Sequence, residues 1–96
     1  MNKTLIEEAI KSALARYGYE HTNIIRSSVC NTDTNVLGVE IEYGRKPDKL
    51  YYKLDLTFDH YAIIWVETNE MGVPMNHLDA IKKAIKQARK DAKRAK

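Results

Sequence analysis

Apolar residues near the start of the chain recur three and four positions apart, which is the period of an amphipathic helix. The stripe consists of Ile6, Ala9, Ile10, Ala13, Leu14 and Tyr17. Thr4 and Glu7 have the spacing of a capping box at its start, and Gly18 can end it in the left-handed conformation without strain. The pattern predicts a helix over about residues 5–17.

Between residues 23 and 68 the apolar period changes to two, as in β-strands. Three segments are clearly strand-like, Val36–Tyr43, Leu50–Phe58 and Ala62–Thr68, and Ile24–Cys30 is a weaker fourth. The connections are short and rich in turn-forming residues. We therefore expect the four strands to pair in chain order as an antiparallel meander.

The register of this sheet follows from its two later connections. Pairing Tyr43 with Leu50, and Phe58 with Ala62, sends only apolar residues and tyrosines to one face. A slip by one residue would bury charged side chains instead, at a high cost in desolvation. The expected inner face comprises Leu37, Val39, Ile41, Tyr43, Leu50, Tyr52, Leu54, Leu56, Phe58, Ala62, Ile64 and Val66.

A second apolar seam follows Pro74 and predicts a C-terminal helix over residues 77–95. The alanines in its second half anchor it weakly, because they bury little apolar area. The seam consists of Leu78, Ile81, Ile85, Ala88, Ala92 and Ala95. We predict one α+β domain over residues 1–96, a two-layer α-β-β-β-β-α sandwich in which both helices cover one face of the antiparallel meander sheet. A coiled-coil pair of the C-terminal helices is the main alternative use of the seam.

The outer face of the predicted sheet carries the most distinctive side chains. The register places Lys53 between Glu40 and Glu67. A tryptophan with other apolar groups, ringed by acids, is typical of a protein-binding hot spot. The candidate anchors are Trp65, Tyr51 and Ile63, and the candidate acidic rim is Glu40, Glu42, Asp55 and Glu67. Two alternatives are that Trp65 lies flat over Gly38 and shields its own strand, and that two copies pack these faces together as a homodimer.

Charge is unevenly distributed along the chain. Residues 17–76 carry five basic and nine acidic groups, whereas residues 77–96 carry eight basic and two acidic groups. The polar side of the predicted C-terminal helix carries Lys82, Lys83, Lys86, Lys90, Lys93 and Arg94. These cations are candidates for contacts with nucleic-acid phosphates, and the alternative is a solvated helix face whose lysines complement the helix dipole.

The order helix, strands, helix resembles that of double-stranded-RNA-binding domains. The sequence Lys82-Lys83-Ala84-Ile85-Lys86 is similar to the basic motif on their second helix. Here the motif follows a full helical turn instead of beginning the helix, no loop reads Gly-Pro-x-His, and a further strand is predicted. The resemblance is therefore a shared order of elements, which does not carry function.

The sequence contains no recognisable catalytic motif. The three histidines have no metal-ligand spacing, Cys30 has no histidine near it in sequence, and the glycines are scattered instead of forming a phosphate loop. Lys53 between two acids argues against a divalent cation, so we expect no catalysis, metal or cofactor. A single cysteine, no apolar run that could span a membrane and no secretory signal favour a cytoplasmic location.

These features together predict a small non-catalytic binding protein. It would act by stoichiometric contact with a partner protein that has a basic surface, as an inhibitor or adaptor of the kind that mobile genetic elements encode. The alternative is a nucleic-acid-binding protein that contacts phosphates with its C-terminal helix.

Overall fold

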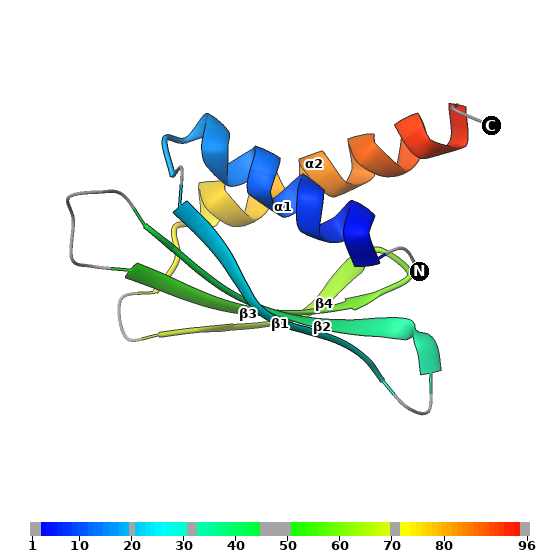
Figure 1. Ribbon diagram of the computed structural model, residues 1–96, viewed down its shortest axis with the longest axis horizontal. Helices are drawn as coiled ribbons and strands as arrows, with labels where there is room; N and C mark the ends of the chain where they lie inside the picture. The colour runs from blue at the N-terminus through cyan, green and yellow to red at the C-terminus, as the bar shows by residue number, and fades with distance from the viewer. Residues whose placement is uncertain (1–2, 20, 31–32, 45–50, 70–71, 95–96) are drawn as a thin grey trace.

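Two helices lie on one face of a four-stranded antiparallel sheet in the computed structural model (Figure 1). The structure describes residues 3–19, 21–30, 33–44, 51–69 and 72–94. The elements are α1 (Lys3–Arg16), β1 (His21–Cys30), β2 (Asp33–Gly44), β3 (Tyr51–Asp59), β4 (Ala62–Thr68) and α2 (Met75–Arg94). The strands pair in the order β1-β2-β3-β4, which confirms the predicted α-β-β-β-β-α meander fold.

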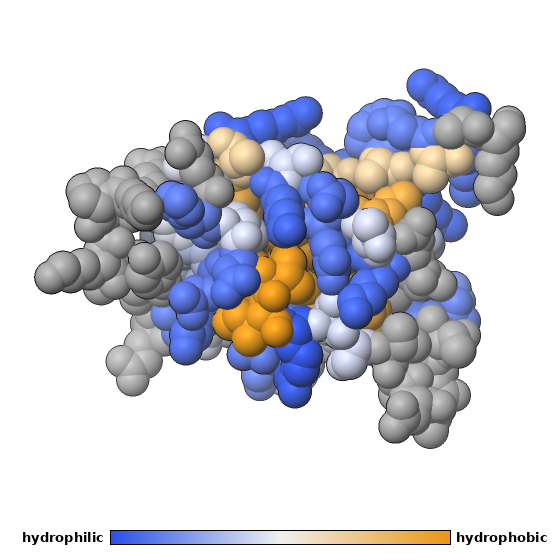
Figure 2. All heavy atoms as spheres, viewed as in Figure 1, coloured by the Kyte–Doolittle hydropathy of each residue, from blue (hydrophilic) through white to orange (hydrophobic). Residues whose placement is uncertain are grey.

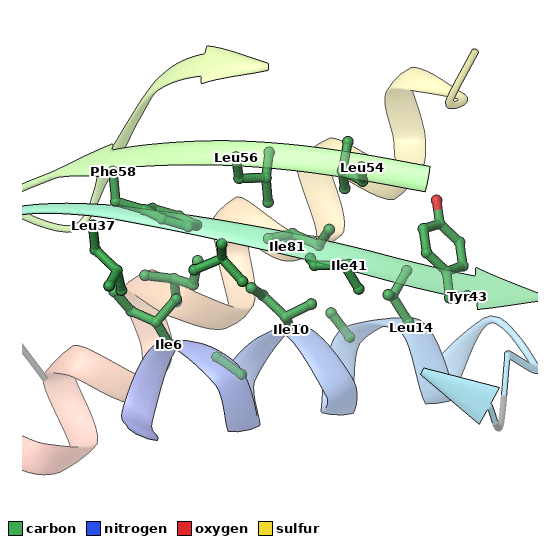
Figure 3. Close-up of a cluster of buried hydrophobic side chains, with 14 residues drawn as sticks. Ile6, Ile10, Leu14, Leu37, Ile41, Tyr43, Leu54, Leu56, Phe58 and Ile81 are labelled. Carbon is green, nitrogen blue, oxygen red and sulfur yellow. The ribbon is translucent and has the colours of Figure 1, made fainter. Parts of the chain in front are cut away.

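The hydrophobic core lies between the sheet and the two helices (Figure 3). Its members belong to the helical and strand-like apolar patterns of the sequence. Burying each large aliphatic or aromatic side chain stabilises the fold by roughly 1.5–3 kcal/mol. The core consists of Ile6, Ala9, Ile10, Ala13, Leu14, Leu37, Val39, Ile41, Tyr43, Leu54, Leu56, Phe58, Ile81 and Ile85.

A polar contact also attaches α1 to the sheet. The Ser27 hydroxyl on β1 donates a hydrogen bond to the Glu7 carboxylate on α1. The helix begins at Lys3, so Thr4 already lies inside it. The predicted capping box is therefore wrong, because Glu7 bonds to a strand residue instead of turning back to the helix start.

The register of β2 and β3 differs from the prediction by two residues. Tyr43 faces Tyr52 and not Leu50, and the same displacement applies along the whole pair. A shift by two leaves every side chain on its predicted face, because side chains alternate with a period of two. The predicted inner-face residues Leu37, Val39, Ile41, Tyr43, Leu54, Leu56 and Phe58 are buried, and Tyr52 is partly buried. Leu50 lies outside the described residues. The rows on the outer face change.

The β3–β4 hairpin turns through two residues, His60 and Tyr61, between the paired residues Asp59 and Ala62. Both turn residues have positive φ angles, 50° and 70°. This is the backbone of a type I′ turn, which matches the twist of antiparallel strands. The predicted pairing of Phe58 with Ala62 is wrong by one residue for this reason.

Helix α2 packs on the core through its first half. Ile81 and Ile85 are buried, whereas residues 89–94 are all exposed. The Arg89 guanidinium lies 5.1 Å from the centre of the Tyr61 ring, a cation–π contact between α2 and the β3–β4 turn. Neither described helix is long and apolar enough to cross a membrane.

Candidate protein-binding face

Strand β4 is an edge of the sheet, and six of its seven residues are exposed. Three large apolar side chains follow one another in it: Ile64 is 57% exposed, Trp65 is 59% exposed and Val66 is 37% exposed. Contiguous exposed apolar groups are uncommon on monomeric proteins and mark interaction surfaces. The exposure of this strand is therefore the first structural indication of a binding site.

A β-bulge sets the directions of the side chains in β4. Ile63 and Val66 pair with buried core residues of β3, and one extra residue lies between these two pairs. Side chains alternate along a strand, and a bulge interrupts this alternation once. With Ile63 and Val66 on the inner face, Ile64 and Trp65 therefore both lie on the outer face. The predicted outer position of Ile63 and inner position of Ile64 are wrong. Ile63 packs against the core and Ile64 is exposed.

Three carboxylates lie in line across the outer face. Glu40 on β2, Asp55 on β3 and Glu67 on β4 occupy directly opposite positions, and we call them the acidic row. Arg26 on β1 faces Glu40, with its Nη2 3.7 Å from the Glu40 Oε2. Asp55 and Glu67 are thus adjacent like charges, an arrangement that costs stability in a sheet.

Lys53 does not lie in the acidic row. The shifted register pairs it with Glu42, so its predicted position between Glu40 and Glu67 is wrong. A shallow hollow of about 200 Å³ lies beside the row and is lined by Glu40, Lys53, Leu54, Asp55, Glu67, Thr68 and Asn69. Within the described ranges, no three potential ligand side chains lie close enough together to hold a metal ion.

Trp65 stands clear of the helices and of Gly38. Thr57 lies between Trp65 and Gly38 in their row. A Cβ atom added to Gly38 would have only Ser28 atoms within 4 Å among the described residues. The alternative in which Trp65 covers Gly38 is therefore wrong. Tyr51 begins β3, but its side chain lies outside the described part of the chain.

The helix layer has the opposite charge. The six predicted phosphate contacts on α2 are all exposed: Lys82, Lys83, Lys86, Lys90, Lys93 and Arg94. Exposed basic residues on α1, which the sequence analysis did not include, are Lys3, Lys11 and Arg16. A groove of about 870 Å³ between the helices has four cations in its lining, Arg16 from α1 and Lys83, Lys86 and Lys90 from α2, together with Asp79 and Asp91. Hydrophilic side chains gather along the outer side of both helices in Figure 2.

Four tyrosine rings surround a buried histidine at the Tyr43 end of β2. His77 is 5% exposed, and its ring lies 5.1–6.0 Å from the rings of Tyr17, Tyr19, Tyr43 and Tyr52. The Tyr43 hydroxyl lies 3.0 Å from His77 Nδ1. Burial raises the pKa of Tyr43 above its ordinary value of 10.0, and the neighbouring Tyr19 and Tyr52 raise it further. Sequence reasoning missed this cluster, because its members come from four different segments: the α1–β1 connection, β2, β3 and α2.

No protein-family model, curated protein or solved structure matches the chain. The likeness to double-stranded-RNA-binding domains stays a shared order of elements. The geometry and charge of the outer face and of the helix layer are therefore the basis for a function.

Proposed function

We propose that the protein is a non-catalytic binding protein that docks a partner protein on the outer face of its sheet, next to β4. The observation that supports this most is the exposure of Trp65, 59%, beside Ile64 and the acidic row. The partner would have a basic surface, and the protein would act in the cytoplasm as a stoichiometric inhibitor or adaptor.

The chemistry of this surface is that of an interface hot spot. An indole buries a large area on binding and loses little rotamer entropy, so tryptophan contributes strongly to interfaces. Glu40, Asp55 and Glu67 place negative charge in the row next to the indole, which attracts a basic partner and speeds association. The neighbouring carboxylates thus favour specificity, and the apolar side chains favour affinity.

Replacing Trp65 by alanine is expected to weaken partner binding by about 2 kcal/mol, or roughly thirtyfold, because the indole is the largest side chain available to the interface. Wild-type protein and the Trp65→Ala variant are used as baits in a lysate of the native cell, and mass spectrometry identifies the partner as a protein that the wild type captures more strongly than the variant. Titration of the purified partner with both baits then gives the ratio of dissociation constants.

Ile25→Ala is the matched control for this experiment. Ile25 is 45% exposed but lies on β1, at the other edge of the sheet. Its replacement should leave partner binding within about twofold of wild type. Equal binding by wild type and Trp65→Ala would refute the proposed function.

A second candidate function is nucleic-acid binding by the helix layer. The observation that favours it is that Arg16 of α1 lines the same groove as three exposed lysines of α2, whereas the sequence pointed to α2 alone. Phosphate contacts by lysine and arginine release counterions, so such binding depends steeply on salt.

If the helix layer binds nucleic acid, affinity for a labelled duplex should fall by orders of magnitude between about 50 and about 200 mM salt. The combined replacement of Lys83, Lys90 and Arg94 by glutamate should abolish binding, as measured by fluorescence anisotropy with RNA and DNA duplexes. Lys53→Glu, on the sheet, is the control and should change little. An absence of binding at low salt would reject this candidate.

A further inference from the structure

Within the described part of the chain, β4 is an edge strand with no strand paired to its outer side. The Asn69 N–H donates to the Lys53 carbonyl, 3.3 Å away, so these two residues form a hydrogen-bonded pair. Hydrogen-bonded and non-hydrogen-bonded pairs alternate in an antiparallel ladder. The backbone groups of Glu67 therefore also point to β3, and those of Val66 and Thr68 point away from the sheet.

Strand β4 lacks two of the common side-chain protections against pairing with another strand. Edge strands are commonly protected by lysine or proline, and Ala62–Thr68 contains neither. The opposite edge, β1, carries Arg26, whose side chain is 69% exposed. The bulge at Ile64 is the one protective feature of β4, and it leaves the segment from Trp65 onward regular.

We propose that β4 binds an extended segment of the partner protein as a fifth strand, and that this segment places a lysine or arginine beside Glu67. This inference rests on the proposed function and specifies how the partner is held. Strand addition supplies main-chain hydrogen bonds for affinity, while alternate side chains supply specificity.

Charge complementarity identifies the residue opposite Glu67. In the acidic row, Arg26 compensates Glu40 at one end, while Asp55 and Glu67 have no basic neighbour in the row. A fifth strand would extend the row by one position, directly beside Glu67. A basic side chain there reaches the hollow, where Glu40, Asp55 and Glu67 outnumber the one cation, Lys53, and it offsets the repulsion between Asp55 and Glu67.

A second copy of the chain fits this edge less well than a foreign strand. In an antiparallel pair of two β4 strands centred on Val66, the two Val66 side chains share the inner face, and each Trp65 lies opposite a Glu67 on the outer face. Beyond these residues the bulge reverses the alternation, so side chains on the outer face of one strand would lie opposite side chains on the inner face of the other. Centring the pair on Glu67 instead would place two glutamates opposite each other. In addition, β4 has no basic residue to offer to Glu67.

The register gives the pattern expected in an antiparallel partner strand. A basic residue lies beside Glu67, the next residue lies beside Val66 on the inner face, and the one after it lies over Trp65. The residue beside Val66 is apolar, and the residue over Trp65 is aromatic, aliphatic or a second cation stacked on the indole.

Hydrogen exchange on the full chain tests this geometry directly. The probe is a capped peptide of about ten alternating lysine and valine residues, and the charge-reversed control alternates glutamate and valine. With the lysine peptide, amide exchange should slow by about tenfold or more at Val66 and Thr68, while Glu67 and Asn69, already bonded to β3, stay unchanged. Trp65 is the one tryptophan of the chain, so its fluorescence reports binding.

Two variants at one position separate backbone pairing from side-chain contact. Val66→Pro removes an N–H that points away from β3, which edge strands tolerate, whereas Val66→Thr keeps both the N–H and the branched shape. Val66→Pro should weaken peptide binding by about tenfold, and Val66→Thr by about twofold at most. Circular dichroism establishes that both variants are folded. The hydrogen-exchange experiment on the wild type tests the fifth strand even if one variant does not fold.

Three results would overturn the fifth strand. A change in Trp65 fluorescence without slower exchange at Val66 and Thr68 would mean docking on the outer face alone, and the proposed function would stand. Protection that rises with protein concentration in the absence of peptide would mean that a second copy occupies the edge. No response to the peptide would reject strand addition, while the Trp65→Ala comparison with the native partner would still decide the proposed function.

Discussion

Replacing Phe58 by alanine is expected to lower the free energy of unfolding by about 3–5 kcal/mol. The Phe58 ring is fully buried between the sheet and the helices (Figure 3). Its removal leaves a cavity that the surrounding strands cannot fill without moving. A chain of 96 residues has a total stability of about 5–14 kcal/mol, so the loss is a large fraction of it. Urea denaturation at neutral pH measures the difference.

Trp65→Ala is the matched control, since it also truncates an aromatic side chain to alanine. Trp65 is 59% exposed, so its removal should change the free energy of unfolding by less than about 1 kcal/mol. A similar loss for both variants would contradict the division of the sheet into a buried inner face and an exposed outer face. It would also remove Trp65 from the proposed binding surface.

Stability is expected to fall as the pH rises above 10, by up to about 1.4 kcal/mol per pH unit from Tyr43 alone. Burial, with Tyr19 and Tyr52 nearby, raises the pKa of Tyr43 above its ordinary 10.0. Above pH 10 the unfolded chain therefore loses the Tyr43 proton while the folded chain keeps it. The folded state then binds more protons than the unfolded state, so its stability decreases with pH until the folded pKa is passed. Urea denaturation at intervals from pH 8 to about pH 12 measures this slope.

Tyr43→Phe isolates this effect from the titration of the other tyrosines and the lysines. At neutral pH the variant should be less stable by about 1–2 kcal/mol, because His77 Nδ1 loses the hydroxyl 3.0 Å away. Above pH 10 the gap should narrow and then reverse, since phenylalanine has no proton to lose. A gap that stays constant from pH 8 to about pH 12 would show that Tyr43 does not link stability to pH.

The alternation of apolar and polar residues predicted the burial in β2 and β3 but not their pairing. Leu37, Val39, Ile41 and Leu54 are buried as expected, although the register is displaced by two residues. The apolar pattern repeats every two residues, so a displacement by two satisfies it equally well. The predicted position of Lys53 between Glu40 and Glu67 depended on the register, and it was therefore wrong.

Strand β4 shows where a local pattern carries little information. Residues 62–66 are all apolar, so no alternation distinguishes the inner from the outer side chains. The side of Trp65 was predicted correctly, whereas Ile63 and Ile64 were exchanged by the bulge. Because Ile63 packs on the core near the turn and Val66 returns to the inner face three residues later, the extra residue must lie between them.

The order of helices and strands, the buried faces of α1, β2 and β3, and the division of charge between an acidic body and a basic helix could all be read from the chain. These properties depend on neighbours within one helical turn or one strand, where covalent order and periodicity suffice. The acidic row, the open edge at Val66 and Thr68, and the tyrosines around His77 required the folded molecule. Each of them joins residues that are far apart in sequence, and their distances depend on strand register and helix packing, which no local period specifies.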